Sequence, residues 1–127
     1  MSELGRSGSG RHLEVDISTV DNASVLRVTG AFVGKQVALF RRACFQAQAD
    51  EAKHRIIDLS EVEEIDGYGM AALVGLLARR RREGGEVVLC GLNPDLRSVL
   101  EATNCDSIYR MAVSTSGALE YLKDGKE

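Results

Sequence analysis

One stretch decides the fold, Ile65-Asp66-Gly67-Tyr68-Gly69-Met70-Ala71-Ala72-Leu73. It joins an apolar strand, Arg55-Ile56-Ile57-Asp58-Leu59, to the most hydrophobic helix that the sequence predicts. Glycines stand on both sides of Tyr68 at the helix start, and glycine permits a positive φ or a close approach to the backbone. A helix start also presents free N–H groups and the positive end of a dipole, so such a loop commonly docks anions or partners.

The composition is that of one soluble globular domain. The chain has 127 residues, of which 44% are hydrophobic and 28% charged, so a sizeable core can form. A net charge of -3 argues against a general nucleic-acid binder. No apolar run approaches the roughly 20 residues that cross a bilayer, and the first residues lack the apolar core of a signal peptide. We therefore expect a cytoplasmic protein that is not inserted in a membrane.

The cysteines and histidines give no sign of a metal site. Cys44, Cys90 and Cys105 are odd in number and lack the CxxC spacing of metal or redox motifs. Cys44 and Cys90 stand among apolar neighbours, which predicts small buried side chains. His12 and His54 are isolated from them and from each other. We expect neither a metal nor a cofactor.

The segment before the central stretch predicts a hairpin followed by a helix. Residues 1–11 are rich in Gly and Ser, which is typical of a flexible tail. Apolar residues then alternate with polar ones from Leu13 to Ile17, as in a half-exposed strand. Asp21-Asn22 supplies a turn. The elements expected next are a strand over residues 24–29, ended by Gly30, and a helix from Val33 to about Ala52.

The segment after the central stretch alternates helices and strands. Glu86-Val87-Val88-Leu89-Cys90 predicts a buried strand, parallel to the strand over residues 55–59 because a helix connects the two. The elements expected next are a short helix from Asn93-Pro94 to near Asn104, an edge strand over 108–113, and a final helix from Ser114 through Leu122. The order predicts an α/β (α+β) domain over residues 12–123, with a small mixed sheet of roughly four to five strands, about four helices and a polar tail at 124–127.

Four arginines, Arg79-Arg80-Arg81-Arg82, close the central helix before Gly84 or Gly85 caps it. Cations are favourable at the negative end of a helix dipole, so a solvated helix end explains them. A docking patch for an acidic partner is the alternative explanation, which we favour less. Consecutive residues on a helix point in several directions, so the four form no single stripe.

Two enzymatic interpretations of the central stretch fail. Gly67-x-Gly69-x-x-Ala72 matches a dinucleotide fingerprint as a string, but that motif follows its strand directly. Here Ser60-Glu61-Val62-Glu63-Glu64 intervenes, which we interpret as a solvated acidic loop, and no acidic residue follows Cys90-Gly91 to hold a ribose. There is no G-x-S-x-G elbow, and the clustered carboxylates have no pocket that would separate their pKa values. We therefore do not expect an enzyme.

The ordered motifs from Leu13 to Leu122 resemble the STAS domain of bacterial anti-sigma-factor antagonists. The resemblance is carried by Ile56-Ile57-Asp58-Leu59-Ser60-x-Val62-x-x-Ile65-Asp66-x-x-Gly69, then Gly84-Gly85-x-Val87-Val88-Leu89-Cys90-Gly91-Leu92-Asn93-Pro94, and then Val99-Leu100-Glu101. In that family the loop usually reads Asp-Ser-Ser-Gly or Asp-Ser-Thr-Gly, and the serine after the aspartate is phosphorylated. The resemblance puts Asp66 and Gly69 at the matching ends and Gly67 at the phosphoserine position, where no hydroxyl can receive phosphate.

The resemblance implies a non-catalytic regulator that docks a partner protein through one loop and the helix after it. The docking residues it implies are Asp66, Gly67, Tyr68, Gly69 and Met70. The implied partner is an anti-sigma factor that is also a Ser/Thr protein kinase of the histidine-kinase-like ATPase type. The resemblance then implies partner switching without the usual serine phosphorylation that ends docking. Tyr68 is either an aromatic anchor or a ring packed over the helix start.

Three alternatives stay open. The chain also resembles the STAS subunits of bacterial lipid-transport ABC complexes, whose partner is the transporter ATPase. A small ligand or nucleotide at the loop formed by Gly67 and Gly69 is the second alternative. A homodimer is the third.

Overall fold

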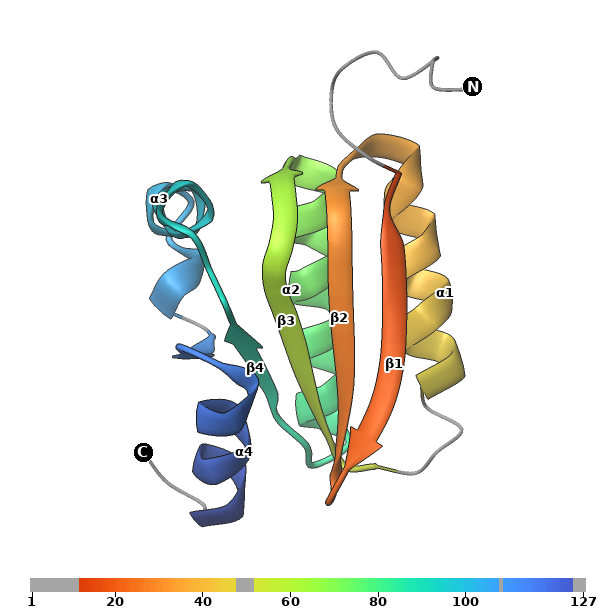
Figure 1. Ribbon diagram of the computed structural model, residues 1–127, viewed down its shortest axis with the longest axis vertical. Coiled ribbons are helices and arrows are strands. Elements are labelled where there is room, and N and C mark those ends of the chain that lie inside the picture. Colours follow the sequence, from red (N-terminus) through yellow and green to blue (C-terminus); the bar gives the residue numbers. More distant parts are fainter. Residues whose placement is uncertain (1–11, 48–51, 108, 125–127) are drawn as a thin grey trace.

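The computed structural model describes residues 12–47, 52–107 and 109–124. Its sheet contains five strands in the order of the sequence, with helices on both faces (Figure 1). The strands are β1 (Glu14–Val20), β2 (Ala23–Phe32), β3 (His54–Ile65), β4 (Val87–Cys90) and β5 (Arg110–Ala112). The helices are α1 (Val37–Ala47), α2 (Gly67–Arg82), α3 (Pro94–Ala102) and α4 (Thr115–Asp124), with 3-10 turns η2 (Gly34–Gln36) and η4 (Cys105–Ser107). The predicted small mixed sheet packed with helices is confirmed.

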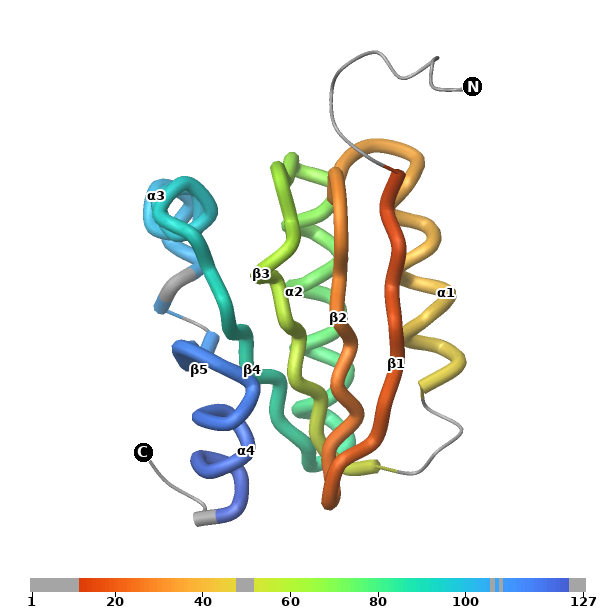
Figure 2. Tube along the Cα trace, viewed as in Figure 1, coloured from red at the N-terminus to blue at the C-terminus, as the bar shows by residue number. Residues whose placement is uncertain are grey.

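The sheet combines one hairpin with parallel strands. β1 and β2 are antiparallel, joined at the predicted turn, where Asp21 adopts a φ of 54°. β2, β3, β4 and β5 are parallel to one another, and Figure 2 traces the path that returns β5 to the side of β4. The carboxyl-terminal ends of these strands therefore share one edge of the sheet, where loops from different parts of the chain meet.

Two hydrophobic cores lie on opposite faces of the sheet. The larger core lies under α1 and α2 and also takes in Leu96 and Leu100 of α3, and the smaller core lies under α4 (Figure 1). Ile56 belongs to the smaller core and Ile57 to the larger, so neighbouring residues of β3 are buried on opposite faces. This confirms the expectation that the continuous apolar run is a strand covered on both sides. Cys44 and Cys90 are buried, as predicted.

The prediction that residues 60–64 form an acidic loop is wrong, because β3 continues through them to Ile65. Val62 is buried while Ser60, Glu61 and Glu63 are exposed, so the glutamates lie on the solvent side of a paired strand. The register with β2 shifts twice here, and each shift gives β3 one extra residue. Such bulges let a strand stay paired although its apolar alternation is broken. β2 likewise runs past Gly30 to Phe32.

The predicted helix from Val33 to about Ala52 is wrong at its start. Gly34 has a left-handed φ of 56°, which no right-handed helix continues through, and α1 begins only at Val37, after the 3-10 turn η2. α1 ends at Ala47, and residues 48–51 lie outside the described part of the chain. The expected tails at 1–11 and 125–127 lie outside it too. No helix within the described ranges is long and apolar enough to cross a membrane.

Candidate functional site

Asp66 connects two neighbouring loops at the carboxyl-terminal edge of the sheet. β2 and β3 end side by side, with Phe32 opposite Ile65, so the loops that follow them meet. One carboxylate oxygen of Asp66, Oδ1, accepts a hydrogen bond from the backbone N–H of Gly69 at 3.1 Å. The other, Oδ2, accepts from the backbone N–H of Gly34 at 2.9 Å. Asp66 therefore caps α2 and fixes the loop before α1 at the same time.

The five residues predicted to dock a partner lie together in this loop and the first turn of α2, but they are not equally accessible. They are Asp66, Gly67, Tyr68, Gly69 and Met70. Gly67 and Tyr68 are exposed, Asp66 is half-buried, and Gly69 and Met70 are buried. Tyr68 exposes 67% of its surface, so most of the ring lies in solvent instead of packing over the helix start. Met70 packs into the larger core and presents little surface to a partner.

The two glycines of the loop have different roles. A Cβ atom on Gly69 would lie 2.5 Å from the carbonyl oxygen of Phe32 and 2.8 Å from Cγ1 of Ile65. Gly69 is therefore required for the close contact between α2 and the ends of the strands. A Cβ atom on Gly67 would have no neighbour within 4 Å. The packing of this protein does not demand glycine at position 67.

The solvent face of α2 is apolar over its first three turns. None of its exposed residues up to the arginine run carries a charge, and they are Gly67, Tyr68, Ala71, Val74, Gly75 and Ala78. The exposed face of a surface helix is normally polar or charged. An uncharged face that begins at an exposed aromatic ring is typical of a protein-binding surface.

A hollow of about 390 Å³ adjoins Tyr68 between the start of α2 and the start of α1. We call it the upper recess, and its lining residues are Gly34, Lys35, Val37, Ala38, Arg41 and Tyr68. The contribution of the loop before α1 was missed in the sequence. The available signal was Gly34, a glycine shortly after an apolar strand, but only the parallel pairing of β2 and β3 reveals that its loop lies beside Asp66.

The arginine run of α2 divides into different environments. Arg80 is 6% exposed, and its guanidinium contacts the carbonyl of Lys53 at 3.5 Å and the carboxylate of Glu83 at 3.0 Å. Arg81 lies 4.0 Å from Glu86. Arg79 is exposed on the side of α2 that faces α1. Arg80 is thus part of the fold, whereas Arg79 belongs to the surface beside the apolar face.

Cys44 of α1 is buried beside this surface. Burial raises the pKa of the Cys44 thiol to about 11, and the nearby Arg55, Arg79, Arg41 and Arg80 oppose this only in part, so the reactive thiolate form is disfavoured at neutral pH. No group of three or more His, Cys, Asp or Glu side chains that could hold a metal ion occurs within the described ranges.

The comparison with known proteins identifies a family. The STAS domain matches residues 14–118. The chain is similar to BtrV of Bordetella bronchiseptica, which is assigned by name to the anti-sigma factor antagonists, with 32% identity over 78 residues, 61% of this chain and 67% of BtrV. A Thermotoga maritima protein assigned by name to the same class is 27% identical over 105 residues, 82% of this chain and 93% of the relative.

Solved structures have the same fold. The crystal structure of a Thermotoga maritima protein named as an anti-sigma factor antagonist gives a TM-score of 0.76 at 24% identity, covering 86% of this chain and 94% of that one. An anti-sigma factor antagonist from Mycobacterium paratuberculosis gives 0.77 at 22% identity, covering 87% and 94%. SpoIIAA in its unphosphorylated form gives 0.74 at 17% identity, covering 87% and 97%. At these identities the likeness establishes the fold alone.

Proposed function

Because this chain belongs to the STAS domain family and is similar to anti-sigma factor antagonists, we propose that it is a non-catalytic regulator that docks a partner protein. The docking surface is the loop at residues 66–69 together with the first turns of α2. The partner is an anti-sigma factor with a Ser/Thr kinase domain of the histidine-kinase-like ATPase type, met in the cytoplasm.

One observation carries this proposal, the uncharged solvent face of α2. Tyr68 stands at its beginning with 67% of its surface exposed, and no charged residue interrupts the exposed positions before Arg79. Aromatic rings in this setting are the side chains that most often dominate binding energy at interfaces. The two hydrogen bonds of Asp66 hold the loop before the partner arrives, which lowers the entropic cost of binding.

We further propose that the usual off-signal is absent. A phosphate at the start of α2 would add nearly two negative charges to a surface that must contact the partner. Gly67 occupies that position and has no hydroxyl. A Cβ atom at this position would have no neighbour within 4 Å, so a serine would fit and the packing does not require glycine. Docking is therefore constitutive with respect to this site.

Affinity capture from the native cells tests the docking surface. Tagged wild-type protein is expected to retain a kinase-type ATPase, and Tyr68→Ala is expected to weaken the complex by roughly 1–3 kcal/mol. Val113→Ala is the matched control, because Val113 is 92% exposed and lies just before α4. Circular dichroism verifies that both variants fold. Equal retention by the two folded variants would refute the proposed surface.

Phosphorylation of the captured complex tests the missing off-signal. Incubation with ATP is expected to leave residues 66–69 of the wild-type protein unmodified, because Gly67 has no acceptor oxygen. Gly67→Ser is expected to gain one phosphate at that position and to release the partner. Intact mass and peptide mapping measure both. Phosphate on Tyr68, or a folded Gly67→Ser that stays unlabelled by a kinase active on another substrate, would count against the proposal.

A further inference from the structure

Two of the helices that pack on the larger core, α1 and α2, carry charge of one sign only. α1 reads VALFRRACFQA and α2 reads GYGMAALVGLLARRRR, so neither helix contains an acidic residue. The turn before α1 adds Lys35. Acidic residues lie on other elements, on the strands at Glu14 and Asp16 of β1 and at the glutamates of β3, and on α3 and α4. The surface formed by α1 and α2 is therefore positive although the net charge of the chain is -3.

A groove follows the seam between α1 and α2. Its first part is the upper recess, beside Tyr68. Its second part, the lower recess, has about 80 Å³ and is lined by Phe40, Arg41, Cys44, Ala72, Gly75, Leu76 and Arg79. Arg41 lines both parts, so one cation borders the whole of the groove. From Tyr68 to Arg79 the seam follows α2 for about 17 Å at 1.5 Å per residue, which is the length of about three helical turns.

The cations along this groove are available to a partner. Arg80 and Arg81 are engaged by Glu83 and Glu86. Neither Arg41 nor Arg79 forms an ion pair with any carboxylate in the described part of the chain. They stand at the edges of a floor that is apolar, and an unpaired arginine beside an apolar surface is well suited to bind a carboxylate as water is excluded.

The floor also allows a close approach. Gly75 is exposed in the middle of α2, and a Cβ atom there would have no neighbour within 4 Å. Glycine inside a helix is destabilising relative to alanine, and the packing of this protein gives no reason for it. Ala71, one turn earlier, is exposed as well. Small residues on successive turns let a second helix come close.

From this groove we propose that the segment of the partner that docks here is an acidic amphipathic helix, which lies along the seam with its apolar face on Gly75 and Tyr68 and its carboxylates on Arg41 and Arg79. This inference rests on the proposed function and specifies the chemistry of its partner. An apolar floor favours a protein helix over a nucleic acid, which would present phosphates but no apolar face to fill it.

Two synthetic peptides test the inference on the full chain. Each has about 14 residues, long enough to span the seam, has Leu and Ala at helical spacing, and is stapled on its outer face because short helices are marginal in water. One carries Glu at the flanking positions and the other carries Lys at the same positions. Titrated into isotope-labelled protein, the Glu peptide is expected to shift amide resonances of residues 34–41 and 68–79, with weaker binding at high salt. The Lys peptide is expected to leave them unchanged.

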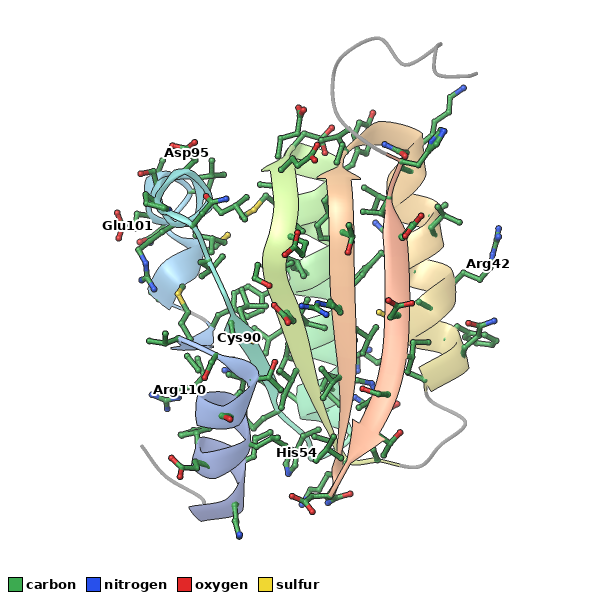
Figure 3. All side chains as sticks on the ribbon, viewed as in Figure 1. Arg42, His54, Cys90, Asp95, Glu101 and Arg110 are labelled. Carbon is green, nitrogen blue, oxygen red and sulfur yellow. The ribbon has the colours of Figure 1, made fainter. Side chains whose placement is uncertain are left out.

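Adjacent arginines on α1 provide a matched pair of variants. Arg41 lines the groove, whereas Arg42 lines a hollow on the β1 side of α1 and projects away from the molecule (Figure 3). Arg41→Glu and Arg42→Glu change the net charge equally. Arg41→Glu is expected to lower the affinity for the Glu peptide about tenfold, and Arg42→Glu is expected to leave that affinity within about a factor of two.

Several results would overturn the inference. They are no shifts from the Glu peptide at millimolar concentration, equal shifts from both peptides, equal effects of Arg41→Glu and Arg42→Glu, or tighter binding of a short DNA duplex at the seam. If any of these occurs while capture of the partner still depends on Tyr68, the acidic helix is rejected and the proposed function stands. If Tyr68→Ala leaves capture unchanged, the proposed function itself is rejected.

Discussion

At the scale of single residues, we expect Asp66 to support binding by holding two loops in place more than by touching the partner. Its two carboxylate oxygens are already used by the backbone N–H groups of Gly69 and Gly34. We therefore expect Asp66→Ala to lower the free energy of unfolding by about 1–2 kcal/mol, the usual value of a helix cap, and to weaken partner binding because two loops lose their fixed geometry. Urea denaturation measures the first effect and titration of the captured partner the second. Weakened binding with unchanged stability would mean that Asp66 contacts the partner directly.

The two loop glycines form a second test at this scale. Gly69→Ala places a methyl group against the carbonyl of Phe32, and such overpacking costs about 1–3 kcal/mol. Gly67→Ala meets open space at the first position of α2 and is expected to be neutral or to stabilise by up to about 1 kcal/mol. Urea denaturation of both variants gives the comparison. Equal losses of stability would contradict the different roles assigned to the two positions.

At the scale of elements, α2 combines a buried face with an exposed apolar face that we propose binds the partner. Gly75→Ala separates the two roles because the variant should change them in opposite directions. Helix propensity predicts a gain of about 0.5–1 kcal/mol in the free energy of unfolding. The same methyl group would lie on the floor of the groove and is expected to weaken binding of the captured partner. A variant that is more stable and binds equally well would remove Gly75 from the interface.

The environment of His54, at the start of β3, predicts that the stability of the fold depends on pH. Nδ1 of His54 accepts a hydrogen bond from the backbone N–H of Glu86 at 3.1 Å, at the end of the sheet opposite the docking loop (Figure 3). Burial, with Lys53 and Arg80 acting in the same direction against Glu86, lowers the pKa of His54 from its ordinary 6.5. The unfolded chain therefore binds a proton before the folded one does, and stability falls as the pH drops below about 6.5. Above that pH both states are neutral and this contribution is constant.

His54→Asn is the matched variant for this prediction, because its amide oxygen can accept the same hydrogen bond and does not titrate. Urea midpoints of both proteins at about pH 7.5 and pH 5.5 make the comparison, and the loss at the lower pH is expected to be larger for the wild-type protein. Equal losses would show that His54 contributes nothing to the acid sensitivity.

The elements also show what a single sequence can reveal. The alternation around Leu13 and the continuous apolar run at Ile56 and Ile57 depend only on local burial, so both strands were predictable. The continuation of β3 through its exposed glutamates was not predictable. It depends on pairing with β2 through two bulges, and pairing between distant segments leaves no local pattern in the sequence. The same limit hid the loop at Gly34, which joins the site only because β2 and β3 are parallel.

At the scale of the whole molecule, charge is separated between the two sides. The helices α1 and α2 are basic, while β1 and the second half of β3 carry the carboxylates. The arginine run could be read from the sequence, but its two interpretations could not be separated there. The structure separates the two interpretations, because Arg80 is buried and forms an ion pair with Glu83, whereas Arg79 borders the groove. Such a separation orients a charged partner before contact, so association should slow as ionic strength rises.

Hydrogen–deuterium exchange of the chain, alone and with its captured partner, tests the central claim most directly. We expect the partner to slow exchange in peptides covering residues 34–41 and 66–79, because those segments form the docking loop and the seam. Peptides covering β1 should exchange as before, since they lie on the acidic side. Protection confined to β1 and β2, with α2 exchanging as in the free protein, would contradict the account.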